Sequence, residues 1–248
     1  MTLRGCAVAG RRRLRAARRR TFEQFGSTRY SHPAREEIER ALEAHLPEET
    51  GFFVEAGGYD GYTESNTYYL ERFRGWSGVL VEPIPRLYRL CVAERPGSRV
   101  FNCALVASDF PDDHVHMLDG DNQSVVKGAW EHVHEPGALV TQGDWSARGC
   151  RGAAPPHEVS VPARTLTSIL DEVGAPVVDL LSLDVEGYED QVLNGLDLAR
   201  YAPRLILVEA WDRFGPGREV IEAVIGDRYR QVAQPTPHDF LYARRSEY

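Results

Sequence analysis

Short apolar runs alternate along the chain with segments in which apolar residues recur every three or four positions. The runs are typical of buried parallel strands, and the spaced segments are typical of helices with one apolar face. The predicted strands are residues 51–55, 78–82, 99–105, 177–184 and 205–209. The predicted helices are residues 31–46, 64–74, 87–93, 167–173, 188–193 and 218–225. This alternation predicts an α/β fold whose parallel strands are joined by right-handed crossovers.

The ends of the predicted helices and the last two strands carry local signals. Ser31 is expected to cap the first of these helices, with Pro33 in its first turn. Residues 229–232 and 240–243 flank a turn that contains Pro235, so they predict an antiparallel hairpin. The hairpin is expected to extend the sheet at its C-terminal end.

One long segment lacks periodicity. Residues 114–118 alternate and predict a further strand, whereas residues from about 119 to 157 predict a lid or an acceptor-binding loop. No second core is visible in the pattern. We therefore expect a basic arm and N-terminal helix over residues 1–48, followed by a single domain over residues 49–248 that contains this loop.

Charge is distributed unevenly. The formal net charge is -8, yet the first twenty residues contain eight arginines: Arg4, Arg11, Arg12, Arg13, Arg15, Arg18, Arg19 and Arg20. The acidic remainder argues against general nucleic-acid binding. We interpret the arm as a solvated basic helix that packs loosely on the acidic body or on a second subunit, with an organellar transit peptide as the alternative.

Composition sets the compartment that we expect. No apolar run is long enough to cross a bilayer, so no membrane partner is predicted. Cys6, Cys91, Cys103 and Cys150 show no metal-binding spacing, which predicts reduced thiols in a cytoplasm. Cys91 and Cys103 lie in apolar segments and are expected in the core.

The segment from Val54 to Thr67 reads Val-Glu-Ala-Gly-Gly-Tyr-Asp-Gly-Tyr-Thr-Glu-Ser-Asn-Thr and begins inside the first predicted strand. Glycines at a strand end let a ligand approach the backbone, and the next helix is expected to supply free N–H groups for a carboxylate. Glu82 ends the second predicted strand, where an acid accepts ribose hydroxyls in dinucleotide folds. The glycines do not spell G-x-G-x-x-G, which favours an adenosyl ligand without a pyrophosphate.

Several segments together resemble the FkbM family of methyltransferases. They are residues 55–61, 65–67, 81–85, 102–105, 165–166 and 183–189, with Val192, Leu193 and Gly195. The resemblance implies a Rossmann-like class I methyltransferase fold, an α/β fold with a mostly parallel seven-stranded sheet, helices on both faces and a C-terminal antiparallel hairpin. It also implies S-adenosylmethionine as donor and, as acceptor, a hydroxyl group of a sugar, an oligosaccharide or a polyketide glycoside. Tyr59 departs from the Asn or Ala that the family often carries there.

The resemblance assigns the cofactor site by position. Glu55, Gly57 and residues 65–67 are expected to hold the methionine end, and Glu82 the ribose. The full predicted cofactor set is Glu55, Gly57, Tyr59, Asp60, Ser65, Asn66, Thr67, Glu82, Pro83, Ala104, Leu105 and Asp184.

Methyl transfer to a hydroxyl needs positioning and a group that takes the acceptor proton. Asp184 ends the fourth predicted strand and Glu186 follows it, so either is a candidate base at the carboxyl edge of the sheet. With Glu209, the same two acids are candidate ligands for magnesium. The alternative is that Glu186 or Glu189 caps the following helix, and for Glu189 we favour a cap or exposure to solvent.

Histidines and tryptophans offer further candidates. His238 is the histidine that we select as a catalytic, substrate-side group. The pairs His114/His116 and His132/His134 are interpreted as polar residues without a metal, because no third ligand has a matching spacing. Trp130, Trp145 and Trp211 are candidates for an acceptor platform.

The predicted function is O-methylation by an S-adenosylmethionine-dependent enzyme, in a homo-oligomer or a monomer. Two alternatives stay open at this point: a non-catalytic adenosyl-binding domain that recruits a partner through the arginine arm, and a nucleic-acid methyltransferase. Against the second, the chain lacks an Asn/Asp-Pro-Pro-Tyr motif for a flipped base.

Overall fold

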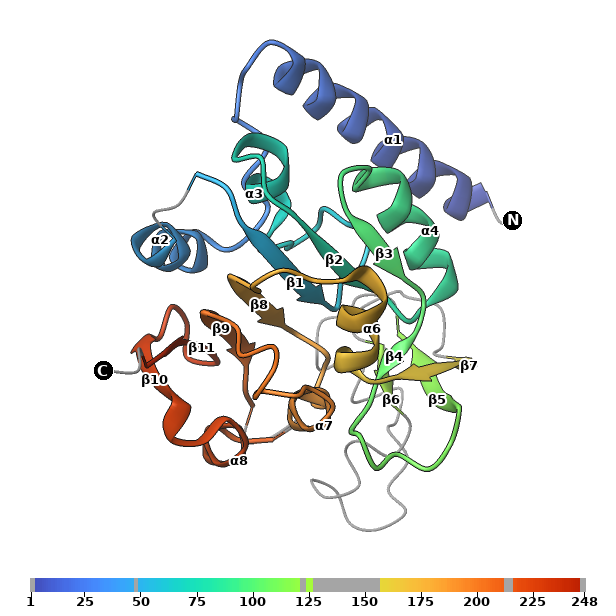
Figure 1. The fold of residues 1–248 in the computed structure, drawn as a ribbon. Coiled ribbons are helices and arrows are strands. Elements are labelled where there is room, and N and C mark those ends of the chain that lie inside the picture. Colours follow the sequence, from blue (N-terminus) through green and yellow to red (C-terminus); the bar gives the residue numbers. More distant parts are fainter. Residues whose placement is uncertain (1–2, 47–48, 121–123, 127–156, 212–215, 246–248) are drawn as a thin grey trace.

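The computed structural model describes residues 3–46, 49–120, 124–126, 157–211 and 216–245. Its centre is a seven-stranded sheet in the order β10-β11-β9-β8-β1-β2-β3 (Figure 1). The strands are β1 (Phe52–Ala56), β2 (Ser77–Val81), β3 (Arg99–Phe101), β8 (Leu180–Leu183), β9 (Leu205–Glu209), β10 (Tyr229–Ala233) and β11 (Asp239–Arg244). The pairs β3·β2, β2·β1, β1·β8 and β8·β9 are parallel, and β11 runs antiparallel to both β9 and β10. The predicted fold class and terminal hairpin are confirmed.

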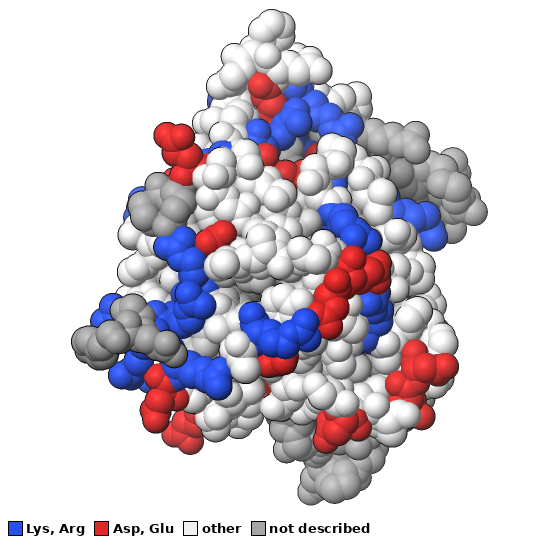
Figure 2. All heavy atoms as spheres, viewed as in Figure 1, with Lys and Arg blue, Asp and Glu red and all other residues white. Residues whose placement is uncertain are grey.

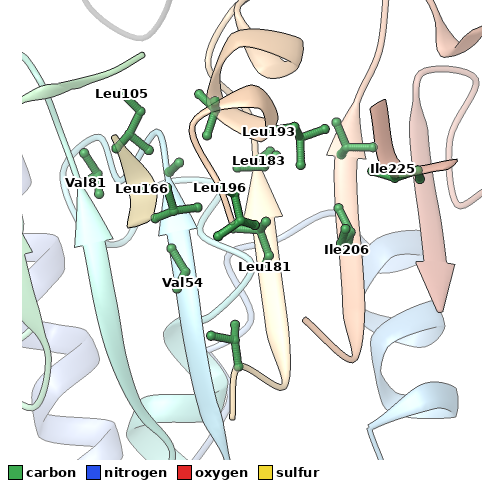
Figure 3. Close-up of a cluster of buried hydrophobic side chains, with 14 of the residues drawn as sticks. Val54, Val81, Leu105, Leu166, Leu181, Leu183, Leu193, Leu196, Ile206 and Ile225 are labelled. Carbon is green, nitrogen blue, oxygen red and sulfur yellow. The ribbon is translucent and has the colours of Figure 1, made fainter. Parts of the chain in front are cut away.

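Alternate residues of the central strands face opposite sides of the sheet. Val54, Val81 and Leu181 belong to one apolar cluster, whereas their neighbours Phe53 and Leu80 belong to another. Figure 3 shows the first cluster between the strands and the helices that cover them. Since both faces are apolar, each must be covered, which explains why these strands read as continuous apolar runs.

Helices cover each face. The first cluster contains apolar side chains of α6 (Leu166–Val173), α7 (Glu189–Asn194) and α8 (Arg218–Ile225), and α8 continues into the 3₁₀ turn η2 (Gly226–Arg228). The second cluster contains side chains of α2 (Glu36–His45), α3 (Tyr68–Phe73) and α4 (Pro85–Glu94). α6 begins at a Thr165 cap that accepts from the Ser168 N–H and ends at Gly174 in the left-handed conformation.

A second, four-stranded sheet lies beside the first in the order β4-β7-β5-β6. Its strands are β4 (Ala104–Leu105), β5 (His114–Asp119), β6 (Val125–Val126) and β7 (His157–Arg164). The strand predicted over residues 99–105 is therefore wrong as one element. Asn102 divides it, because its amide donates to the carbonyl oxygens of Glu82 (2.9 Å) and Pro83 (2.7 Å). β3 stays in the main sheet, and β4 pairs with β7, a strand that the sequence pattern did not predict.

Two predicted helices start later than expected. The helix predicted from residue 31 begins at Glu36, and Ser31 does not cap it, since the buried Ser31 hydroxyl donates to the Glu23 carboxylate at 2.8 Å. The helix predicted from residue 64 begins at Tyr68. Before α3, the Glu55 carboxylate accepts from Ser65, Asn66 and Thr67 and so holds these residues outside the helix.

The arginine arm forms a helix on the body of the molecule. α1 (Leu3–Gln24) runs across α3 and α4 (Figure 1), and basic and acidic side chains lie next to each other along it (Figure 2). The expectation of loose packing is wrong, because Arg19 and Glu23 are buried. No helix in the described part of the chain is both long and apolar enough to cross a membrane.

Cys91 and Cys103 have the core positions that we expected, and His114 and His116 are polar surface residues. Cys91 and Cys103 are buried free thiols, and burial raises the pKa of Cys103 to about 12. His114 and His116 are exposed and pair with Asp113 (2.8 Å) and Glu158 (2.9 Å). His132 and His134, together with most of the predicted loop, lie outside the described residues.

Candidate functional site

A cavity lies at the carboxyl ends of β1, β2 and β8, the edge at which open parallel sheets bind ligands. The space at this edge, counted with the solvent in its open mouth, is about 870 Å³. The residues that line it are Ala56, Gly57, Tyr59, Thr63, Glu64, Val81, Glu82, Pro83, Cys103, Ala104, Leu105, Met117, Ser124, Val126, Asp184, Val185, Glu186 and Tyr188. Seven of the predicted cofactor residues thus line one cavity, together with the predicted catalytic residue Glu186. β5 and β6 form one wall of the cavity, which the sequence pattern did not predict.

The glycine turn after β1 brings two strand ends together. Gly57 has φ 88, and a Cβ there would lie 1.9 Å from the carbonyl oxygen of Asp184. The N–H groups of Gly57 and Gly58 both donate to the Val81 carbonyl, at 3.1 and 3.0 Å. A glycine is therefore needed at position 57, because the ends of β1 and β8 touch here on the cavity wall.

Three other residues on this wall have left-handed backbone conformations. Tyr59, Glu64 and Glu186 have φ values of 45, 57 and 60, and they are the non-glycine residues with positive φ in the described part of the chain. All three line the cavity. Because such conformations cost free energy and concentrate at functional sites, their shared location marks this cavity as the candidate site.

Glu82 lies at the end of β2, is buried, and contributes its carboxylate to the lining. Its two oxygens accept hydrogen bonds from the N–H groups of Tyr59 (2.7 Å) and Ile84 (2.8 Å). Burial raises the pKa of Glu82 to about 8, although the two N–H groups oppose this shift. Each oxygen retains a lone pair, so the carboxylate can accept further hydrogen bonds from a ligand.

An ion pair beside Glu82 joins the two sheets. Arg86 of α4 donates to both carboxylate oxygens of Asp119 at the end of β5, at 2.9 and 2.6 Å. Asp119 is buried. This bidentate pair holds β5 against the main sheet and so fixes the wall that includes Met117.

Glu55 does not line the cavity, and its carboxylate holds the residues behind the wall. It accepts from the hydroxyls of Ser65 (2.9 Å) and Thr67 (2.5 Å) and from the Asn66 N–H (2.8 Å). Arg95, which is 1% exposed, donates to Glu55 at 3.2 Å and also to Ser65 and Thr67. Arg95 was missed by sequence reasoning, and its place just after a helix carries no signal that distinguishes it from a surface arginine.

Several N–H groups near the start of α3 already have partners within the chain. Asp60 accepts from the N–H groups of Tyr62 (2.9 Å) and Thr63 (2.6 Å), and Ser65 accepts from that of Tyr68 (3.1 Å). These three N–H groups are therefore not free for a ligand. The buried Oδ1 of Asn66 has no hydrogen-bond partner among the described residues, although its amide donates to Ser182 at 3.0 Å.

Acids are concentrated at the ends of β8 and β9. Asp184 is exposed to the cavity, but protein surrounds it on most sides. Loss of hydration and the nearby carboxylates of Glu209, Glu186, Glu189 and Asp239 raise its pKa. A carboxyl group with a raised pKa suits proton transfer near neutral pH.

Glu189 holds the turn that precedes α7, and the predicted exposure to solvent is wrong. It is buried, and its Oε1 accepts from the N–H groups of Val185 (3.0 Å) and Gly187 (3.1 Å). Burial raises the pKa of Glu189 to about 8. Glu186 lines the cavity, while Glu189 holds the turn that presents it.

The proposed metal ligands do not form a metal site. In the residues described, no group of three or more His, Cys, Asp or Glu side chains is arranged to hold a metal ion. Asp184, Glu186 and Glu209 therefore do not support the predicted magnesium site.

His238 is near this edge but is not part of the cavity lining. Its ring stacks on Trp211, with centroids 3.4 Å apart and an interplanar angle of 11°. The carbonyl of His238 accepts from the Ala210 N–H at 2.8 Å, so the stacked pair lies just beyond the end of β9. Trp130 and Trp145 lie outside the described residues.

The chain is similar to a known protein family over residues 55–228, where it matches the model described as the methyltransferase FkbM domain. No curated protein matches it. A similar solved structure is the methyltransferase FkbM from Methylobacillus flagellatus KT (TM-score 0.48, 12% identity, 86% of this chain and 49% of that chain). The chain thus spans about half the length of that protein.

Two further solved structures are similar. One is a TehB-like SAM-dependent methyltransferase from Corynebacterium glutamicum ATCC 13032 Kitasato (TM-score 0.43, 12% identity, 96% of this chain and 100% of that chain). The other is an RNA methyltransferase from Salinibacter ruber in complex with S-adenosyl-L-homocysteine (TM-score 0.38, 15% identity, 85% of this chain and 90% of that chain).

Proposed function

Because the chain belongs to the FkbM methyltransferase family, we propose that it transfers the methyl group of S-adenosylmethionine to a hydroxyl group of a sugar, an oligosaccharide or a glycosylated natural product. One observation carries the proposal: Gly57, Glu82 and Asp184 meet in one cavity at the carboxyl edge of the sheet. A glycine turn, an acid on the second strand and an acid on the fourth suit an adenosyl ligand.

The residues present fit this cofactor. The close contact at Gly57 leaves no side chain between the turn and the cavity, which allows a ligand to approach the backbone. Glu82, which lines the cavity, would accept the ribose hydroxyls. S-adenosylmethionine supplies the activated methyl group when bound.

The protein's part in the reaction is to orient the acceptor and to take its proton. We assign the base to Asp184 or Glu186, because both face the cavity and the pKa of Asp184 is raised by its surroundings. Trp211, stacked on His238 beyond the end of β9, offers an aromatic surface for a sugar ring.

Calorimetric titration with S-adenosylhomocysteine tests the cofactor assignment. We expect Glu82→Gln to weaken binding by about tenfold to a hundredfold, because hydrogen bonds to a charged acceptor are lost. Glu219→Gln, on an exposed part of α8, should bind like wild type. No binding by the folded wild-type protein would overturn the proposal.

The same titration has an expected pH dependence. Ribose hydroxyls donate to the ionised form of Glu82, and that form becomes populated only as pH rises through about 8. Affinity for S-adenosylhomocysteine should therefore increase between pH 6 and pH 9 in wild type. The increase should be smaller in Glu82→Gln, and equal pH profiles would argue against Glu82 as the ribose anchor.

Acceptor screening separates the two candidate bases. With sugar and glycoside acceptors, Asp184→Asn and Glu186→Gln should each be compared for kcat and for cofactor affinity. We expect the base variant to lose kcat by about a hundredfold or more when kcat is measured at saturating cofactor. If neither variant loses turnover, the proton is taken by another group.

A further inference from the structure

We infer that α1 positions the part of the cavity wall that residues 59–64 form, and that Arg19 is the main positioning residue. The expected effect of α1 on cofactor binding rests on the proposed function, whereas the contacts that α1 makes do not depend on it. We call the contacts between α1 and this wall the brace. α1 lies before residue 55, where the match to the family model begins, so the model does not cover this helix.

Arg19 is buried against the turn that leads to α3. Its guanidinium lies 3.5 Å from the centroid of the Tyr62 ring and donates to the Tyr68 hydroxyl at 3.0 Å. It also pairs with Glu94 of α4, and only 4% of the residue is exposed. A single arginine thus joins α1 to the turn, to the start of α3 and to α4.

Glu23, one turn further along α1, completes this contact. Its carboxylate accepts from the Tyr68 hydroxyl (2.8 Å) and from Arg72 (2.9 Å). Tyr62 and Tyr68 pack edge to face with centroids 5.0 Å apart. The two tyrosine rings are therefore held between α1 and the body by charged groups that are themselves paired.

A second contact reaches the same wall from about two turns earlier in α1. Arg12 pairs with Asp60, and Asp60 in turn accepts from the N–H and the hydroxyl of Thr63. Thr63 lines the cavity, between Tyr59 and Glu64. Since Tyr59 and Glu64 have left-handed backbone conformations, the wall needs outside contacts to hold it in this shape.

Hydrogen exchange without ligand tests the brace directly. In Arg19→Gln, amides of residues 59–64 should exchange about tenfold faster than in wild type, because the turn opens more often. Arg15→Gln is the matched control, since Arg15 is exposed on the same helix. Ile221→Val, a buried change in α8, controls for a general loss of stability.

The two variants are compared under conditions in which their free energies of unfolding are equal. Equal exchange rates of the amides of residues 59–64 in Arg19→Gln and Ile221→Val would then overturn the inference. Arg19→Lys provides a milder variant that keeps the charge near Glu94 but loses the planar contact with Tyr62. We expect it to give intermediate exchange rates, and wild-type rates would show that the charge alone suffices.

Binding then links the brace to function. We expect Arg19→Gln to weaken S-adenosylhomocysteine binding by about tenfold at a temperature where it is fully folded, because the wall must be ordered on binding. Wild-type affinity in Arg19→Gln would overturn the positioning role. If wild type itself does not bind while the exchange result holds, the proposed function fails and the brace remains.

Discussion

Two buried carboxylates at the same edge of the sheet, Glu55 and Glu189, have opposite surroundings. Glu55 contacts the buried guanidinium of Arg95 as well as hydroxyl and N–H donors. Glu189 accepts from two N–H groups and has other acids nearby, including Glu209, and its pKa is raised to about 8. The first arrangement pairs the carboxylate with a cation and several donors behind the cavity wall, whereas the second raises the pKa of a carboxyl group beside the cavity.

This difference matches the roles that we propose for the two regions. The wall that Gly57, Tyr59, Thr63 and Glu64 line after β1 must keep its shape to bind a cofactor, and the paired charges and donors behind it do this. The acids at the ends of β8 and β9 must gain and lose a proton, and like charges in a desolvated place shift their pKa toward neutrality. The largest loss of stability is expected from a variant in the region of paired charges around Glu55.

Arg95→Gln should give the largest loss of stability. It leaves the buried Glu55 and the half-buried Glu71 without their cation, which costs about 3–5 kcal/mol in free energy of unfolding. Urea denaturation measures this loss, and the exposed Arg40→Gln in α2 should remain close to wild type. A double variant with Glu55→Gln should lose less than the sum of the single losses, and strict additivity would contradict the coupling.

Gly57→Ala tests the place where the two regions touch. The new Cβ would clash with the Asp184 carbonyl, so we expect a loss of about 2–4 kcal/mol from strain and overpacking together. Gly174→Ala is matched for the left-handed backbone, but nothing lies within 4 Å of its Cβ, and it should cost only about 1 kcal/mol. Equal losses in thermal or urea unfolding would show that contact between the strand ends is unimportant.

The last prediction concerns the pH dependence of stability. Glu189 has an ordinary pKa of 4.5 when unfolded and about 8 when folded, so the folded state binds the proton more tightly between these values. Stability should therefore be full below about pH 4.5 and should fall as pH rises toward 8, by at most roughly 1.4 kcal/mol per pH unit for this group.

Glu189→Gln keeps an acceptor for the two N–H groups but removes the titration. Its unfolding free energy should fall less steeply than that of wild type between pH 5 and pH 8, with Glu219→Gln as an exposed control. Parallel curves for wild type and Glu189→Gln would mean that Glu189 is ionised in the folded protein, and the contrast with Glu55 would disappear.

The local pattern of apolar residues predicted the seven-stranded sheet well and the four-stranded sheet poorly. β9 and α8 have the predicted bounds, because a continuous apolar run and a clear helical period need little help from other elements. β7 was missed and residues 99–105 were taken as one strand, since the division depends on the amide of Asn102 bonding to the end of β2. Such a contact joins residues far apart in the sequence.

The candidate site was likewise predicted only in part from the sequence. By itself the sequence determined that Gly57, Glu82 and Asp184 end neighbouring parallel strands, because strand order and chain direction place such residues at one edge. Only the tertiary structure decided that Glu55 supports the wall instead of lining it, that Arg19 is buried, and that β5 and β6 close the cavity. Burial and pairing of charges depend on which surfaces meet, and the order of residues along one chain does not specify that.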